Sequence, residues 1–172
     1  MKTKIYTNCI EAKSAIADGE FTGYASIYNI IDASGDVVLP GAFRDTLAQK
    51  RQIQLLWQHD HREPIGYFSE IFETVQGLFV RGKLLTELLR AREAYALIKS
   101  GVIDGLSIGY EIDDAFFASG IRYIKSITLW EISLVTFPAN QEARIGEVKS
   151  EIAQLLAARA AMERSISILQ NV

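Results

Sequence analysis

The sequence is poor in residues that cross-link chains or bind metals: it contains one cysteine and two histidines among 172 residues. A single cysteine, Cys9, cannot form an intramolecular disulfide, and with no histidine beside it we interpret it as a structural thiol rather than a nucleophile. The spacing His59-Asp60-His61 is compatible with a shared metal, but no third histidine or second cysteine exists to complete a zinc site. We therefore expect neither a metal nor a cofactor.

Long apolar runs and a strong excess of one charge are also absent. No stretch of about 18 consecutive apolar residues occurs, so we expect no transmembrane helix. The N-terminal segment MKTKIYTNCIEAK lacks the apolar core of a secretory signal, which favours a location inside the cell. The net charge of −3 gives no indication of a nucleic-acid partner.

Strand-like segments dominate the rest of the chain, and turn residues separate them. Asp32–Asp36 is typical of a turn, Pro64 is expected to break a strand, and Gln76-Gly77 is typical of a hairpin connection. The pattern predicts a mainly β, α+β fold: an antiparallel β-barrel or strongly curled sheet of about seven strands, flanked by helices. The expected strands are residues 20–31, 37–39, 52–59, 65–75, 78–85, 106–112, 121–128 and 129–137.

Helical patterns occur at residues 41–50, between Thr86 and Gly101, and at residues 148–169. Thr86 is a candidate N-cap and Gly101 a candidate terminating glycine for the central helix. In the last helix apolar residues alternate at spacings of four and three, which fits either packing on its own barrel or pairing with another helix in a homo-oligomer. We divide the chain into a barrel domain, residues 1–146, and a C-terminal helix, residues 147–172.

Three short stretches carry side chains that a hydrolase uses: LLWQHD with His59, DGLSIGY with Ser107 and LWEISLVTFPAN with Glu131. A serine hydroxyl becomes nucleophilic when an imidazole accepts its proton and a third group orients that imidazole. Strand alternation puts Ser107 and Glu131 opposite the apolar side chains of their own strands, with glycines on either side of Ser107. Spacing alone also fits a small-residue strand, a solvated glutamate and a core histidine.

Longer stretches of the sequence carry a more specific signal. From about Gly23 to Val148, the segments GYASIYNIIDASGDVVLPGAF, LLWQHD, EPIGYF, LRAREAYALIKSGVIDGLSIGY and LWEISLVTFPANQEARI occur in this order. The chain resembles the prohead maturation protease family of tailed bacteriophages, serine peptidases similar to the herpesvirus assemblins. Several independent segments match, so the resemblance does not depend on one short motif.

The resemblance implies an assemblin-like barrel with His59 as base, Ser107 as nucleophile and Glu131 as third member of a triad. It also implies that part of the oxyanion hole comes from the loop after the Glu131 strand, where Arg144 or neighbouring backbone N–H groups are candidates. The implied substrate is scaffold or major capsid protein, and the chain itself, inside an assembling procapsid in the bacterial host cytoplasm.

Two other functions remain open at this point. The first is a capsid-associated β-barrel without catalysis that binds scaffold protein. The second is an esterase or amidase for a small molecule. The string Gly105-Leu-Ser-Ile-Gly109 fits the letters of a nucleophile elbow, but its serine is expected on a strand and not at a strand-to-helix turn. We therefore favour the endopeptidase.

Overall fold

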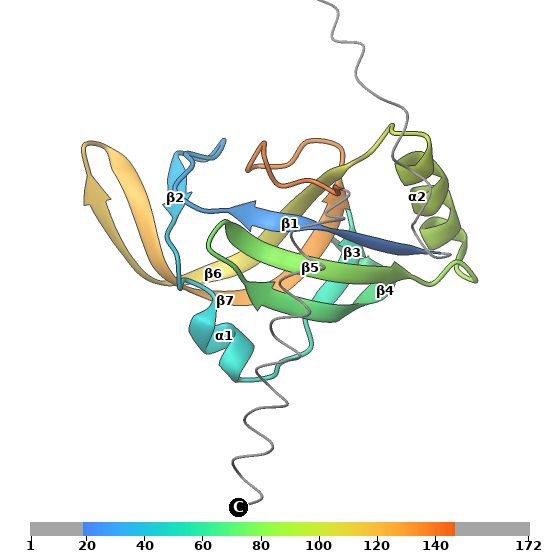
Figure 1. Ribbon diagram of the computed structural model, residues 1–172, viewed down its shortest axis with the longest axis horizontal. Helices are drawn as coiled ribbons and strands as arrows, with labels where there is room; N and C mark the ends of the chain where they lie inside the picture. The colour runs from blue at the N-terminus through green and yellow to red at the C-terminus, as the bar shows by residue number, and fades with distance from the viewer. Residues whose placement is uncertain (1–18, 147–172) are drawn as a thin grey trace, which may run out of the picture.

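The computed structural model describes residues 19–146, which form one curled mixed β-sheet with two helices at its margins (Figure 1). The strands are hydrogen-bonded in the order β1-β5-β4-β3-β7-β2, and β6 pairs with β7. In chain order the elements are β1 (Glu20–Ile27), β2 (Asp36–Val38), α1 (Arg44–Ala48), β3 (Gln54–Trp57), β4 (Asp60–Glu73), β5 (Gly77–Leu84), α2 (Leu89–Lys99), β6 (Gly105–Ala118) and β7 (Ile121–Val135).

Strand β7 lies at the centre of this arrangement, because it pairs with β2, β3 and β6. It runs antiparallel to β6 but parallel to both β2 and β3. The predicted antiparallel barrel therefore needs correction: the sheet is mixed and curls into a half-barrel. Hairpin turns fix the direction of consecutive strands, whereas β3 and β7 are separated by four other elements, so no short turn determines how they pair.

The strands also differ in detail from those expected. The two strands expected at 121–128 and 129–137 form one continuous strand, β7, which ends at Val135. Strand β6 continues to Ala118 to complete a long hairpin that projects from the sheet (Figure 1). Pro64 does not end a strand but lies inside β4, opposite Leu56. The β3–β4 register shifts on both sides of this pair, and such irregularities accommodate a proline that cannot donate to the ladder.

The central helix begins later than its sequence suggests. Its N-cap is Leu88, without a side-chain cap, so the prediction of Thr86 as N-cap is wrong. Its end is as predicted, because Gly101 follows the last turn with a φ of 72°, a conformation that glycine adopts at little cost. Within residues 19–146, neither helix is long and apolar enough to cross a membrane.

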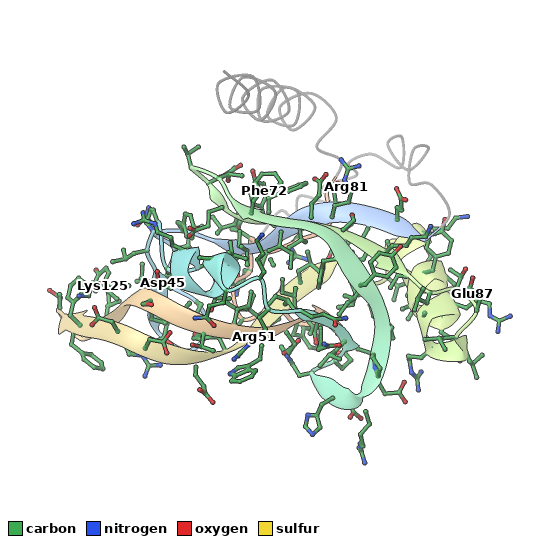
Figure 2. All side chains as sticks on the ribbon, turned by 90° about the horizontal axis from the view of Figure 1, so that it is seen from below. Asp45, Arg51, Phe72, Arg81, Glu87 and Lys125 are labelled. Atoms are coloured by element: carbon green, nitrogen blue, oxygen red, sulfur yellow. The ribbon has the colours of Figure 1, made fainter. Side chains whose placement is uncertain are left out.

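Most of the buried hydrophobic side chains of residues 19–146 form one core cluster within the curled sheet, while Asp45, Glu87 and Lys125 lie on the outside (Figure 2). Full burial of each large aliphatic side chain contributes roughly 1.5–3 kcal/mol. Residues 143–146 lie between β1 and β6, with bridges from Gly23 to Ile145 and from Gly105 to Arg144. Cys9 and the predicted helix at residues 148–169 fall outside the described residues.

Candidate functional site

Ser107 and Glu131 lie on the same face of two neighbouring strands, β6 and β7. The register pairs Ser107 with Ser133 and Gly109 with Glu131, without a bulge between these pairs. Ile132, which alternates with Glu131 and Ser133, is fully buried in the core on the opposite face. The predicted alternation is therefore observed, and it sets the Ser107 hydroxyl on the face that points away from the hydrophobic core.

His59 reaches this face from strand β3, on the other side of β7. The chain reverses through Gln58 and His59, which have φ values of 51° and 61°, and Trp57 then pairs with Asp60. Positive φ at both central residues is typical of a tight hairpin turn, although for side chains other than glycine it costs roughly 1–3 kcal/mol each. His59 was expected at a strand end; it lies in the turn, so strand alternation does not determine where its side chain points.

Hydrogen bonds to β7 hold this turn in place. The backbone N–H of Gln58 donates to the carbonyl of Leu134 at 2.9 Å, and the N–H of His59 donates to the Ser133 hydroxyl at 3.0 Å. The Gln58 side chain donates to the Thr136 hydroxyl at 2.9 Å. The turn that carries the imidazole is therefore attached to the strand that also carries Glu131.

The imidazole of His59 bonds directly to Glu131, with 2.5 Å between Nδ1 and Oε1. An ionised carboxylate can only accept, so Nδ1 carries the proton, and in the neutral ring Nε2 is left as the acceptor. The hydrogen bond to Glu131 raises the pKa of His59 above its usual value, burial lowers it by a smaller amount, and the glutamate charge raises it further. The side chains are 44% exposed for His59 and 12% for Glu131, so the carboxylate is the better shielded partner.

His59 and Ser107 line the same cavity, whose volume is about 210 Å³. The loop between β1 and β2 forms one wall, and the loop after β7 forms another. These loops cover the outward face of β6, which explains why Ser107 is only 7% exposed. The lining residues are Ala25, Ser26, Ile30, Asp32, Ser34, Asp36, Val38, His59, Ser107, Ile108, Tyr110, Ala139 and Asn140.

Sequence reasoning did not identify the acidic wall of this cavity. Asp36 accepts two hydrogen bonds from Arg122, at 2.8 and 2.6 Å, which tie β2 to β7. Asp32 accepts from the backbone N–H groups of Ser34 and Asp36, as expected for a turn at this segment. Burial, followed by the charges of these two aspartates, raises the pKa of Tyr110 to about 12. The two aspartates therefore stabilise the fold through these hydrogen bonds and also line the cavity.

The hydroxyl of Ser26 is a second feature that the sequence did not reveal. Its oxygen is buried without a hydrogen-bond partner among the described residues, and the residue lines the cavity. A buried hydroxyl without a partner is unfavourable, so this group is available to a bound molecule.

The structure does not bring the guanidinium of Arg144 into the cavity. Its Nη1 donates to Asp104 at 2.5 Å and its Nε donates to the carbonyl of Gln141 at 2.9 Å. Ala139 and Asn140, from the same loop, do line the cavity. Ala139 accepts from the N–H of Ala33 at 2.9 Å, which ties this loop to the loop between β1 and β2.

His61 and the glycines beside Ser107 complete the placement of the sequence candidates. His61 is exposed on β4 and is not a cavity residue. In the part of the chain that the structure describes, no group of three or more His, Cys, Asp or Glu side chains could hold a metal ion. The space beside Gly105 is occupied by Val135 and Pro138, and that beside Gly109 by Glu131, so protein atoms fill the space next to both glycines that flank Ser107.

Comparison with known proteins shows that the chain is similar to proteins of tailed bacteriophages. Residues 7–157 match the family model for the caudovirus prohead serine protease. The chain is 39% identical over 137 residues to the prohead protease of Enterobacteria phage HK97, covering 77% of this chain and 61% of that protein. It is 38% identical over 164 residues to the capsid polyprotein of Pseudomonas phage PAJU2, covering 87% of this chain and 23% of the polyprotein. The chain thus spans less than two thirds of each of these two relatives.

Two solved structures share the fold at low sequence identity. The bacteriophage T4 capsid assembly protease superposes with a TM-score of 0.57 at 10% identity, over 71% of this chain and 92% of that chain. KSHV protease, solved with a hexapeptide phosphonate inhibitor, superposes with a TM-score of 0.53 at 13% identity, over 83% of this chain and 76% of that chain. The curled sheet is therefore similar to that of herpesvirus proteases.

Proposed function

Because the chain belongs to the caudovirus prohead serine protease family, we propose that it is a serine endopeptidase with Ser107 as nucleophile, His59 as general base and Glu131 as the orienting carboxylate. The observation that supports this most directly is the position of His59. Its Nδ1 bonds to Glu131, while its residue lines the cavity that Ser107 also lines. No other histidine among the described residues has either property.

In the proposed acylation Ser107 is the nucleophile, and His59 acts first as general base and then as general acid. The Ser107 oxygen attacks the carbonyl carbon of the scissile peptide bond, and its proton passes to Nε2 of His59. Glu131 stabilises the imidazolium through Nδ1–H, and His59 then gives the proton to the leaving amine. Water hydrolyses the acyl-enzyme by the same proton transfers. Proton transfer by a positioned imidazole contributes about 10²–10⁴-fold to the rate.

The tetrahedral oxyanion needs donors on the cavity side of Ser107. Backbone N–H groups of Ala139 and Asn140 are better candidates than the guanidinium of Arg144, because those two residues line the cavity. Arg144 is instead bonded to Asp104 and to the carbonyl of Gln141. We propose that Arg144 acts indirectly, by keeping the loop after β7 in place.

We propose that the substrate is scaffold protein, the major capsid protein or both, and also the chain itself. The names of the relatives support this: one is a prohead protease, and another is a capsid polyprotein that contains a segment similar to nearly all of this chain. A protease fused to capsid protein would enter the procapsid with its substrate. The site of action would be the interior of the procapsid in the host cytoplasm.

Co-expression with the capsid protein of the same phage tests the proposal. We expect new capsid-protein fragments whose appearance depends on Ser107, and labelling of Ser107 by a serine-reactive phosphonate, detected by mass spectrometry. A protein that binds scaffold or capsid protein without producing fragments, and that the phosphonate does not label, would instead be the non-catalytic barrel.

Glu131→Gln is expected to lower turnover by about 10²–10⁴-fold without abolishing it, because the amide can still fill the site but cannot stabilise the imidazolium. Since the hydrogen bond to Glu131 is the main cause of the raised pKa of His59, the acid limb of the pH profile of kcat/KM should move to lower pH. Peptide cleavage measured between about pH 5 and 9 checks both effects. Unchanged turnover would show that the bond between Glu131 and His59 does not contribute to catalysis.

We also propose that residues 148–169 associate with a second copy of the chain, on the basis of their 4-3 apolar spacing. Truncation after Gly146 is then expected to give a smaller species in sedimentation velocity while circular dichroism remains that of a folded sheet. The same number of chains per particle before and after truncation, with an intact fold, would remove this segment from any role in assembly.

A further inference from the structure

The carboxylate of Glu131 is held at both oxygens. Oε1 bonds to Nδ1 of His59 at 2.5 Å, and Oε2 accepts a hydrogen bond from the Ser133 hydroxyl at 2.7 Å. The terminal torsion of a glutamate is broad, so one hydrogen bond would leave the carboxylate free to turn about its last bond. The second bond, from Ser133, fixes the plane of the carboxylate toward the imidazole.

The same Ser133 hydroxyl also holds the backbone of the base. It accepts the N–H of His59 at 3.0 Å, and Ser133 is fully buried. A backbone N–H can only donate and an ionised carboxylate can only accept, so the direction of both bonds is determined: His59 N–H to Ser133, and Ser133 O–H to Glu131. This chain of bonds joins the backbone of His59 to the carboxylate that its own ring contacts. It also holds a residue whose φ of 61° is unfavourable without such support.

Gly109 clears the space in which this carboxylate lies. A Cβ built at Gly109 would overlap Oε1 of Glu131 and approach its Cδ and Cγ to 2.8 and 2.9 Å. The φ of Gly109 is not positive, so the backbone does not require glycine there. The cross-strand register explains the contact, because Gly109 is the direct partner of Glu131 on β6. The carboxylate therefore lies over the backbone of the neighbouring strand.

We propose that Ser133 and Gly109 are positioning residues for the reaction: Ser133 orients Glu131 and the His59 turn together, and Gly109 provides the space for the carboxylate. This inference rests on the proposed function of the triad. Neither residue lines the cavity, so neither is expected to contact substrate. Loss of either should consequently lower kcat and leave KM nearly unchanged.

The first test uses Gly109→Ala, alone and in a Glu131→Ala background. The new methyl group should push the carboxylate away from the imidazole, and a displacement of about 1 Å lowers kcat about 10²-fold. With the Glu131 side chain removed, the methyl group has nothing to displace, so the further loss should be less than about threefold, because the two residues act as one unit. Equal losses in both backgrounds would overturn the role of Gly109.

The second test uses Ser133→Ala, with Ser126→Ala on the same strand as the matched control. We expect Ser133→Ala to lower kcat about 10- to 100-fold at similar KM, and the amide proton of His59 to exchange faster because it has lost its acceptor. Ser126→Ala should change neither. Wild-type kcat and wild-type exchange at His59 in Ser133→Ala would overturn the role of Ser133.

One measurement separates this inference from the proposed function. The pKa of His59, followed by the NMR shifts of its ring, needs no substrate. Gly109→Ala should lower that pKa toward the ordinary histidine value, because the displaced carboxylate no longer holds the ring. If the wild-type protein showed no Ser107-dependent cleavage, the proposed function would be refuted. The lower pKa of His59 in Gly109→Ala would still support the role of Gly109 in placing the carboxylate. An active wild type with no shift in Gly109→Ala would refute the inference alone.

Discussion

Replacement of Ser107 by alanine is expected to abolish peptide cleavage and leave the fold intact. The loss in turnover should be roughly 10⁶-fold, the size seen when the nucleophile of a serine peptidase is removed. The fold should survive because Ser107 lies beside a cavity and the smaller methyl group introduces no clash. Processing of co-expressed capsid protein, followed by the appearance of fragments on a gel, measures the loss.

Ser69→Ala is the matched control, because Ser69 lies on β4 with its hydroxyl bonded to the carbonyl of Arg81, outside the cavity. It should process capsid protein at the wild-type rate and react with the phosphonate, whereas Ser107→Ala should do neither. If Ser107→Ala processed its partner as fast as the wild type, another nucleophile would have to be found.

The face of each candidate on β6 and β7 could be predicted from the sequence, because strand alternation is a local property. Apolar residues alternate with Ser107 and with Glu131, and the structure has both residues on the face opposite the core. What alternation cannot supply is register. The pairing of Gly109 with Glu131, and of Ser107 with Ser133, depends on contacts between strands. The sequence alone therefore could not predict that Gly109 makes room for the carboxylate of Glu131.

The position of His59 could be predicted only in part. Tight hairpin turns are usually recognised from Asn-Gly or Asp-Gly, and Gln58-His59 contains neither. The turn forms nevertheless because the backbone of both residues bonds to β7, at Leu134 and Ser133. Tertiary contacts thus override local preference at the residue proposed as the base.

The cavity was not predictable because its walls come from distant segments of the chain. Strand β2, which follows the loop between β1 and β2, is attached to β7 through Asp36 and Arg122, which are 86 residues apart. The role suggested for the Arg144 guanidinium illustrates the same limit. Its place in the sequence fits an oxyanion donor, but an ion pair with Asp104 directs it elsewhere.

His59→Ala is expected to reduce turnover nearly as much as Ser107→Ala, because the base and the nucleophile act as one unit. His61→Ala should retain most activity, since His61 is exposed on β4 and does not line the cavity. The two histidines are two residues apart, which makes this a closely matched pair of variants. The reverse outcome, an active His59→Ala and an inactive His61→Ala, would move the base to His61.

The pH dependence of cleavage is a second test of His59 as the base. Protonated His59 cannot accept the Ser107 proton, so kcat/KM should fall as the pH is lowered through the pKa of His59. The bond to Glu131 raises that pKa, so half of the activity should already be lost above pH 6.5, the ordinary value for histidine. His61→Ala should keep this midpoint, because His61 does not contact Glu131. A midpoint below pH 6.5 in the wild type would mean that Glu131 does not bond to the base in the free enzyme.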